Sequence, residues 1–149
     1  MPGLSPPADA WRLRRRTLLA MILLVYARLL IALVPLRLWR NRFGLDPSRQ
    51  RGLASENVMP ARAWARHVDR AAARMPFDHK CLPRAMALSL LLRRRGIAHA
   101  IVFAVRRRGH PAHPDRLHAW VEQGGALLIG DEPGPWIEIL RLGERKGCR

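Results

Sequence analysis

A thiol, an imidazole and a carboxylate follow one another in the second half of the chain, at Cys81, His118 and Asp131. Cysteine is the strongest side-chain nucleophile at neutral pH, but it needs a histidine to hold or take the thiol proton. A third polar group must then fix the tautomer of that histidine. His118 and Asp131 fall on the two arms of one expected hairpin and could supply both groups. The three residues in the order Cys, His, Asp are the groups that a cysteine nucleophile needs for catalysis. A lone cysteine and a histidine also occur together by chance in many small domains.

The segment around Cys81 carries the signals of a helix N-terminus. Asp78 is a suitable N-cap residue, Pro83 is tolerated in a first turn, and a leucine-rich run continues to Gly96. The helix would be apolar nearly all round, and therefore central. Because a helix N-terminus lowers the pKa of a thiol through its unpaired N–H groups and dipole, we expect a reactive Cys81 in the first turn, facing a cleft.

The other cysteine and histidines indicate no second site. Cys148 is the penultimate residue, so no structural disulfide is expected and the chain reads as a reduced, cytosolic protein. His110 and His113 fall in a polar loop without a third ligand at metal-binding spacing, and we expect neither a metal nor a cofactor. His67, on an earlier helix, is expected to be a surface or boundary residue without an active-site role.

The chain is strongly basic. Its 149 residues include 27 Lys and Arg against 11 Asp and Glu, which gives a formal net charge of +16. The length fits one small domain, and a hydrophobic content of 49% excludes wholesale disorder. The charge would attract a polyanion, an anionic membrane or an acidic protein without choosing among them. Arginine scattered over solvated faces explains it equally well.

The most apolar segment, residues 11–39, has three interpretations. A signal peptide is disfavoured because no small-x-small cleavage site follows. A transmembrane helix over residues 17–34 would hold Arg28 at its centre, which costs about 2.5 to 3.5 kcal/mol on insertion scales. We favour a long helix that packs on the domain or on a partner, ends at Pro35 and lets Arg28 reach its edge. Peripheral membrane contact stays open because arginines and Trp39 flank the segment.

Apolar periodicity predicts the remaining elements and the fold class. They are a helix over residues 60–75, the helix that starts near Cys81, an internal strand over 97–105, strands over 118–123 and 126–129 joined by a Gly124-Gly125 turn, and a strand or cover over 136–140. One central helix against an antiparallel sheet is an α+β fold.

The second half of the chain also carries the motifs of a known family. Cys81-Leu-Pro-Arg-Ala opens a leucine-rich helix that ends in Arg-Arg-Gly; an apolar strand follows, then His118-Ala-Trp-Val-Glu, a glycine turn and an Asp. Over roughly the last 75 residues this order resembles the transglutaminase-like maturation protease of lasso-peptide biosynthesis, the B protein. The apolar N-terminal helices resemble those that precede the domain in the stand-alone form of that enzyme.

The resemblance implies a transglutaminase-like (papain-like) core and a leader peptidase. Such an enzyme removes the leader from a ribosomally made precursor peptide and frees the amino terminus of the core for the lasso cyclase. The resemblance implies Cys81 as the nucleophile, His118 as its base and Asp131 as the residue that orients the imidazole. Asp131 lies 13 residues after His118 and Glu132 is adjacent, so either carboxylate could face the ring. We favour Asp131 because it ends the strand.

The family also sets the expected partners and domains. Longer members carry a leader-recognition domain of winged-helix type, and no segment here is long enough for one, so a separate leader-binding protein is expected beside the precursor peptide and the cyclase. We divide the chain into a flexible leader (1–10), an N-terminal apolar helix and linker (11–57) and a transglutaminase-like cysteine protease domain (58–149). We therefore expect a cytoplasmic location and leave membrane association open. Nucleic acid is not expected as a partner.

Two functions of other classes compete with the peptidase. The chain could be a basic adaptor without enzymatic activity that binds nucleic acid or anionic membrane, although it has no recognised nucleic-acid motif. It could also be a membrane-embedded accessory whose N-terminal helix is the working part.

Overall fold

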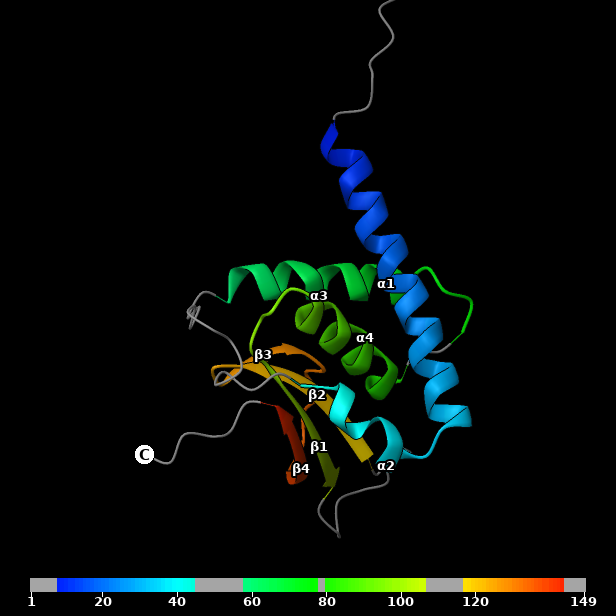
Figure 1. Cartoon of the computed structure of the whole chain (residues 1–149). Coiled ribbons are helices and arrows are strands. Elements are labelled where there is room, and N and C mark those ends of the chain that lie inside the picture. Colours follow the sequence, from blue (N-terminus) through cyan, green and yellow to red (C-terminus); the bar gives the residue numbers. More distant parts are fainter. Residues whose placement is uncertain (1–7, 45–57, 78–79, 107–116, 144–149) are drawn as a thin grey trace, which may run out of the picture.

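A computed structural model of the chain describes residues 8–44, 58–77, 80–106 and 117–143 (Figure 1). Within them the helices are α1 (Ala8–Leu33), α2 (Leu36–Trp39), the short 3-10 helix η1 (Arg40–Arg42), α3 (Met59–Ala72) and α4 (Cys81–Arg94). The strands are β1 (Ala100–Arg106), β2 (Leu117–Gln123), β3 (Ala126–Ile129) and β4 (Trp136–Gly143). Helices packed on one antiparallel sheet confirm the predicted α+β fold class.

The sheet has the strand order β3-β2-β1-β4, with every neighbouring pair antiparallel. β1 is internal, as its two apolar faces predict. Gly124 and Gly125 have φ values of +55° and +83° and form the predicted turn between β2 and β3. β4 pairs with β1, so residues 136–143 form a strand of the sheet.

The two faces of the sheet meet different surroundings. The register pairs Ile101 with Val121 and Phe103 with Ala119, and these residues pack with the helices in the core. Residues opposite one another in an antiparallel pair share a face, and successive residues along a strand alternate between faces. His118 therefore projects from the face that is turned away from α4.

α4 is the central element of the core. It lies between α3 and the sheet, with α1 alongside (Figure 1). The side chains that it buries are at most 2% exposed and include Ala85, Met86, Ala87, Leu88, Leu91 and Leu92. As predicted, the helix is covered on all sides and Cys81 is in its first turn.

α1 is the predicted long apolar helix, and it packs on the domain. It contacts α3 and α4, and it ends before Pro35. The guanidinium of Arg28 lies 5.4 Å from the centre of the Phe77 ring. Among the described helices, α1 is the one long and apolar enough to cross a membrane, by length and composition only. This is weak evidence, compatible with either a soluble or a membrane-associated chain.

Some sequence predictions fall outside the described residues. These are the N-cap role of Asp78, the loop histidines His110 and His113, most of the linker, and Cys148. Residues 8–10, expected as part of a flexible leader, belong to α1. The three-domain division stays a prediction.

His67 is buried, which corrects the expectation of a surface or boundary residue. It is 2% exposed, and its Nδ1 lies 3.2 Å from Oγ1 of Thr17 on α1. Burial and three nearby arginines lower its pKa. The spacing along α3 did not reveal this burial because the residues that cover His67 come from α1, far away in the sequence.

A buried chain of hydrogen bonds ties α4 to the start of β1. The N–H of Gly44 donates to Oγ of Ser89 at 2.9 Å, and this oxygen lies 2.6 Å from Nε2 of His99. Nδ1 of His99 in turn lies 2.7 Å from the carbonyl oxygen of Ile97. A carbonyl only accepts, so the proton is on Nδ1, and the Ser89 hydroxyl donates to Nε2 of a neutral imidazole. Burial is the largest cause that lowers the pKa of His99 to about 4.

We expect the fold to lose stability as the pH falls from about 6.5 toward 4. The pKa of His99 is about 4 in the folded chain against an ordinary value of 6.5, so the unfolded chain binds more protons in this window. The difference corresponds to a free energy of unfolding lower by roughly 3 kcal/mol once the pH is below both values. Urea unfolding of wild type and His99→Gln across this range measures the effect.

His99→Gln should be less stable at neutral pH and should show a shallower fall in acid. His67 contributes a slope of the same sign in both proteins, because its pKa is also lowered. Parallel pH profiles for the two proteins would show that His99 is not the titrating group.

Candidate functional site

Cys81 lies where the N-terminus of α4 meets the start of β2. Its Sγ is 4.0 Å from the carbonyl oxygen of Leu117, at the limit of a hydrogen bond from sulfur. The side chain is partly buried. Its backbone N–H is in the first helical turn, where N–H groups have no partner within the helix. The thiol therefore lies beside the strand that carries His118 in its second position.

The His118 imidazole is buried, with acceptors at both nitrogens. The ring is held at Nε2 by a hydrogen bond of 2.7 Å with the carbonyl oxygen of Gly130. Nδ1 lies 3.0 Å from Oε2 of Glu132, at ion-pair distance but without the alignment of a good hydrogen bond. Because a carbonyl and a carboxylate only accept, a proton on each nitrogen would satisfy both contacts.

Two tryptophans flank the imidazole. The ring centres of His118 and Trp136 are 4.9 Å apart with planes inclined by 26°, and Trp120 lies at 5.7 Å. Trp120 shares the strand face of His118, as the two-residue spacing predicts. The indole N–H of Trp120 donates to Glu122 and that of Trp136 to the Glu132 carbonyl, so both rings are anchored.

Glu132 is the carboxylate that contacts the ring in this structure. β3 ends at Ile129, the chain turns at Gly130, and Asp131 is exposed while Glu132 faces the imidazole. Oε1 of Glu132 also lies 3.6 Å from the guanidinium of Arg106. The sequence left both carboxylates open and ranked Asp131 first because it was expected to end the strand, whereas β3 ends at Ile129. The turn at Gly130 could not be read from the sequence.

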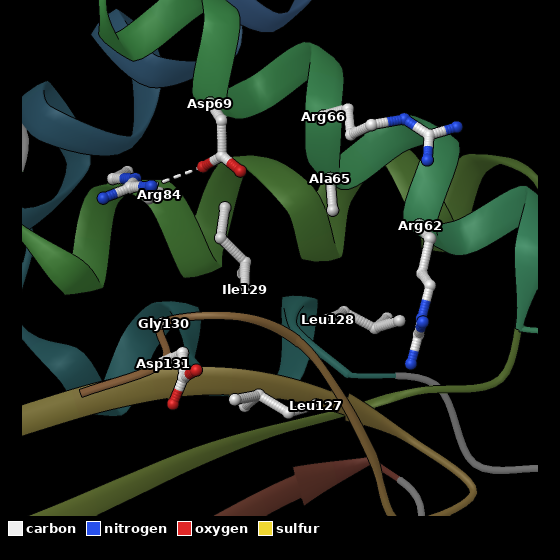
Figure 2. Close-up of a pocket in the computed structure, with 10 residues that line it drawn as sticks. All are labelled: Arg62, Ala65, Arg66, Asp69, Arg84, Leu127, Leu128, Ile129, Gly130 and Asp131. Atoms are coloured by element: carbon white, nitrogen blue, oxygen red, sulfur yellow. Dashed lines mark hydrogen bonds and ion pairs between the residues drawn. The ribbon is translucent and has the colours of Figure 1, made fainter. Parts of the chain in front are cut away.

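A pocket of about 520 Å³ lies between α3, α4 and the end of β3 (Figure 2). Three arginines line it, namely Arg62 and Arg66 from α3 and Arg84 from α4. Arg84 is ion-paired with Asp69, as Figure 2 shows. Asp131 lines the opposite wall. Arg84 follows Cys81 by one helical turn, so the pocket adjoins the thiol end of α4 on its arginine-rich side.

Sequence reasoning missed the two arginines of α3. Arg62 and Arg66 are four residues apart on a helix whose apolar face alone was informative, and nothing in the chain indicated that β3 would pack opposite them. Arg84, the arginine of the Cys81-Leu-Pro-Arg-Ala motif, is held by its ion pair with Asp69.

The thiol of Cys81 lies beside the carbonyl oxygen of Leu117, the residue before His118, while the imidazole is turned toward Gly130 and Glu132. Direct proton exchange between Cys81 and His118 requires the imidazole to change partners by rotating about its side-chain bonds. Catalytic hydrogen bonds are often long or misaligned without substrate and tighten only when it binds. No cluster of three or more potential metal ligands occurs within the described part of the chain.

The comparisons with known proteins give one match. A family model, described as the transglutaminase-like superfamily, matches residues 21–139, from within α1 to within β4. Neither the curated proteins nor the solved structures include a significant match.

Gly130→Ala should destabilise the fold and disturb the His118 contact. Gly130 has a φ of +92°, and a Cβ there would lie 2.8 Å from Cβ of Trp120 and 2.9 Å from the Ala119 carbonyl oxygen. We expect the free energy of unfolding to fall by more than about 2 kcal/mol, because the strain of a side chain at positive φ adds to a clash with the backbone. Urea unfolding measures it.

Gly124→Ala is the matched control. Gly124 also has a positive φ, but a Cβ there meets no atom within 4 Å. The free energy of unfolding of Gly124→Ala should be lower than that of wild type by only about 1 kcal/mol. Equal losses for the two variants would mean that the close approach at Gly130 is unimportant.

Proposed function

The chain belongs to the transglutaminase-like superfamily, and from this premise we propose that it is a cysteine peptidase. The superfamily commonly contains cysteine peptidases and transglutaminases. The observation that supports the proposal best is the position of Cys81 as the first residue of the buried helix α4, beside the strand of His118. A thiol at a helix N-terminus next to a histidine-bearing strand suits nucleophilic attack on a carbonyl carbon.

The proposed reaction is acyl transfer to water. The Cys81 thiolate attacks the carbonyl carbon of the scissile amide, and the backbone N–H of Cys81 donates a hydrogen bond to the oxyanion. His118 as imidazolium then protonates the departing amine, the C–N bond breaks, and a thioester remains. Water attacks the thioester while His118 takes its proton, which releases the acid and restores the thiolate–imidazolium pair.

Two neighbouring groups hold the His118 imidazole in its position. The Gly130 carbonyl accepts a hydrogen bond from Nε2 of His118, and Glu132 lies at ion-pair distance from Nδ1. Rotation of the ring toward the thiol would break the Gly130 hydrogen bond. Substrate binding near Gly130 and Asp131 is a suitable trigger for this rotation, because both residues line the arginine-rich pocket.

The proposed substrate is the leader–core junction of a ribosomally made lasso-peptide precursor. This assignment rests on the Cys-Leu-Pro-Arg-Ala and His-Ala-Trp-Val-Glu motifs and on their order. A separate leader-binding protein and the lasso cyclase are the proposed partners. The pocket with Arg62, Arg66 and Arg84 suits an acidic segment of the peptide, because guanidinium groups bind carboxylates in pairs of hydrogen bonds.

A basic adaptor without enzymatic activity is the second candidate, and the net charge of +16 favours it. The two proposals differ in the role of the thiol. Salt-sensitive binding to nucleic acid that is unchanged in Cys81→Ala, without any peptide cleavage, would support the adaptor.

Leader release followed by mass spectrometry tests the peptidase. The purified full chain, its precursor and the leader-binding protein should yield free leader. Cys81→Ala and His118→Ala should lower the rate by roughly 10²-fold or more, because each removes a group that reacts in the transition state. Cys148→Ala is the matched control and should cleave normally. Normal cleavage by folded Cys81→Ala would refute the proposal.

Asp131→Asn and Glu132→Gln separate the two candidate orienting carboxylates. Glu132 contacts the ring, so Glu132→Gln should lower kcat by roughly 10-fold or more and alter the pH–rate profile, whereas Asp131→Asn should keep most of the activity. Circular dichroism checks that both fold. The reverse order of effects would return the orienting role to Asp131, as the sequence first indicated.

A further inference from the structure

α1 has an apolar face that nothing within the described chain covers. This face, here called the outer stripe, consists of large side chains at helical spacing that are 39% to 77% exposed, namely Trp11, Leu18, Ile22, Val25, Leu29 and Leu33. The spacing of three, four and seven residues places them along one side of the helix. An exposed apolar surface of this length marks an interaction site.

The side of α1 opposite the outer stripe is part of the core. Ala20, Leu23, Leu24 and Ala27 are at most 5% exposed and pack with residues of α3 and α4. A helix that crossed a membrane would have to withdraw these side chains from the core. While these side chains stay in the core, a ligand can reach only the exposed side of α1, which carries the outer stripe.

The charge around the outer stripe is of one sign. Between residues 10 and 45 the chain has no Asp or Glu and eight arginines, namely Arg12, Arg14, Arg15, Arg16, Arg28, Arg37, Arg40 and Arg42. All except Arg28 lie toward the two ends of the apolar segment. Beyond Pro35, Leu36 and Leu38 of α2 are also exposed, at 43% and 64%.

A second pocket adjoins the N-terminal end of the outer stripe. It measures about 350 Å³ and is lined by Trp11, Arg12, Arg15, Arg16, Leu19, Trp64 and Arg95; we call it the N-terminal arginine pocket. Arg15 lies 4.5 Å from the centre of the Trp11 ring, and Arg95 lies 4.5 Å from that of Trp64. Among the described residues no carboxylate lines the pocket or pairs with its four guanidinium groups.

We propose that the chain binds an anionic membrane surface through α1, with the outer stripe inserted between lipid acyl chains and the N-terminal arginine pocket holding a lipid phosphate. An in-plane helix of this kind combines an apolar face with flanking Lys or Arg and a tryptophan at the interface, which are the features assembled here. The N-terminal part of α1 projects beyond α3 (Figure 1).

An acidic protein is the competing occupant, and the shape of the surface argues against it. From Leu18 to Leu33 the outer stripe is apolar, while Arg14 and Arg15 lie between Trp11 and Leu18 at its N-terminal end. A lipid surface matches this pattern along the whole helix, since its apolar interior and its phosphate layer are parallel planes. The proposal does not depend on the peptidase activity.

Vesicle binding by the full-length protein tests the proposal. Extruded vesicles of phosphatidylcholine, with and without phosphatidylglycerol, are pelleted with the protein at low and high salt. We expect binding to the anionic vesicles to be at least roughly 10-fold stronger than to the neutral ones, and to weaken with salt. Tryptophan emission should shift to the blue on binding, and Trp11→Phe should reduce that shift.

Paired variants locate the contact. Ile22→Ser with Leu29→Ser removes apolar area from the outer stripe, and Arg12→Gln with Arg15→Gln removes charge from the pocket. Each pair should weaken binding by roughly 10-fold or more. Matched controls lie elsewhere on the surface: Ile137→Ser on β4, where the side chain is 50% exposed, and the exposed Arg74→Gln after α3. Both controls should bind like wild type.

Several outcomes would overturn the proposal. Absence of binding to the anionic vesicles, or equal losses in the controls and the paired variants, would exclude a membrane site on α1. Full competition by inorganic phosphate would assign the pocket to a free anion. If the wild-type chain dimerises in the absence of vesicles, and the pair Ile22→Ser with Leu29→Ser abolishes the dimer, the outer stripe is a protein interface. Resistance of the bound chain to carbonate extraction would indicate a spanning helix.

Discussion

The burial of α4 on all sides is the constraint on which the rest of the structure depends. A leucine-rich helix with hardly any polar face is stable in water only when other elements cover it, and each large side chain that it buries contributes about 1.5 to 3 kcal/mol. The sheet covers one side, and α1 and α3 cover the others. Because the helix cannot slide or turn within this packing, its first residue, Cys81, has a fixed place beside β2. The rigidity of the thiol is thus a property of the core.

The opposite face of the sheet obeys a different constraint. Ala100, Val102 and Ala104 are fully buried, although within the described residues they do not belong to the core cluster that the helices form with the sheet. Aromatic and charged side chains take that place, including Trp120 and Arg141. The hydrogen bonds that Arg141 donates to Glu138, and then to Glu122, raise its pKa and fix it across the strands. His118 belongs to this polar layer and is held by it.

The proposed site therefore spans the boundary between two layers. The thiol lies beside the carbonyl oxygen of Leu117 at the start of β2, on the side of the sheet that α4 covers, whereas the imidazole of His118 projects from the opposite face. In this structure the imidazole of His118 contacts Glu132 and Gly130. In the proposed mechanism the imidazole must leave these partners before it can meet the thiol.

Much of this could be predicted from the chain alone. The apolar pattern predicted α4, the internal β1 and the hairpin of β2 and β3, because these elements follow from local periodicity and turn chemistry. The choice between Asp131 and Glu132 depends on the turn at Gly130, and the burial of His67 depends on contact with α1. The pocket of Arg62 and Arg66 likewise arises from β3 packing opposite α3. Such features come from tertiary packing, which local patterns do not encode.

The central claim is that Cys81 and His118 form a thiolate–imidazolium pair. The most direct measurement is the rate of iodoacetamide alkylation of Cys81 against pH, in a Cys148→Ser background that leaves a single thiol. With His118 present, alkylation should stay rapid below neutral pH, and His118→Ala should shift the profile to that of an ordinary thiol. Superimposable profiles with and without the imidazole would contradict the claim.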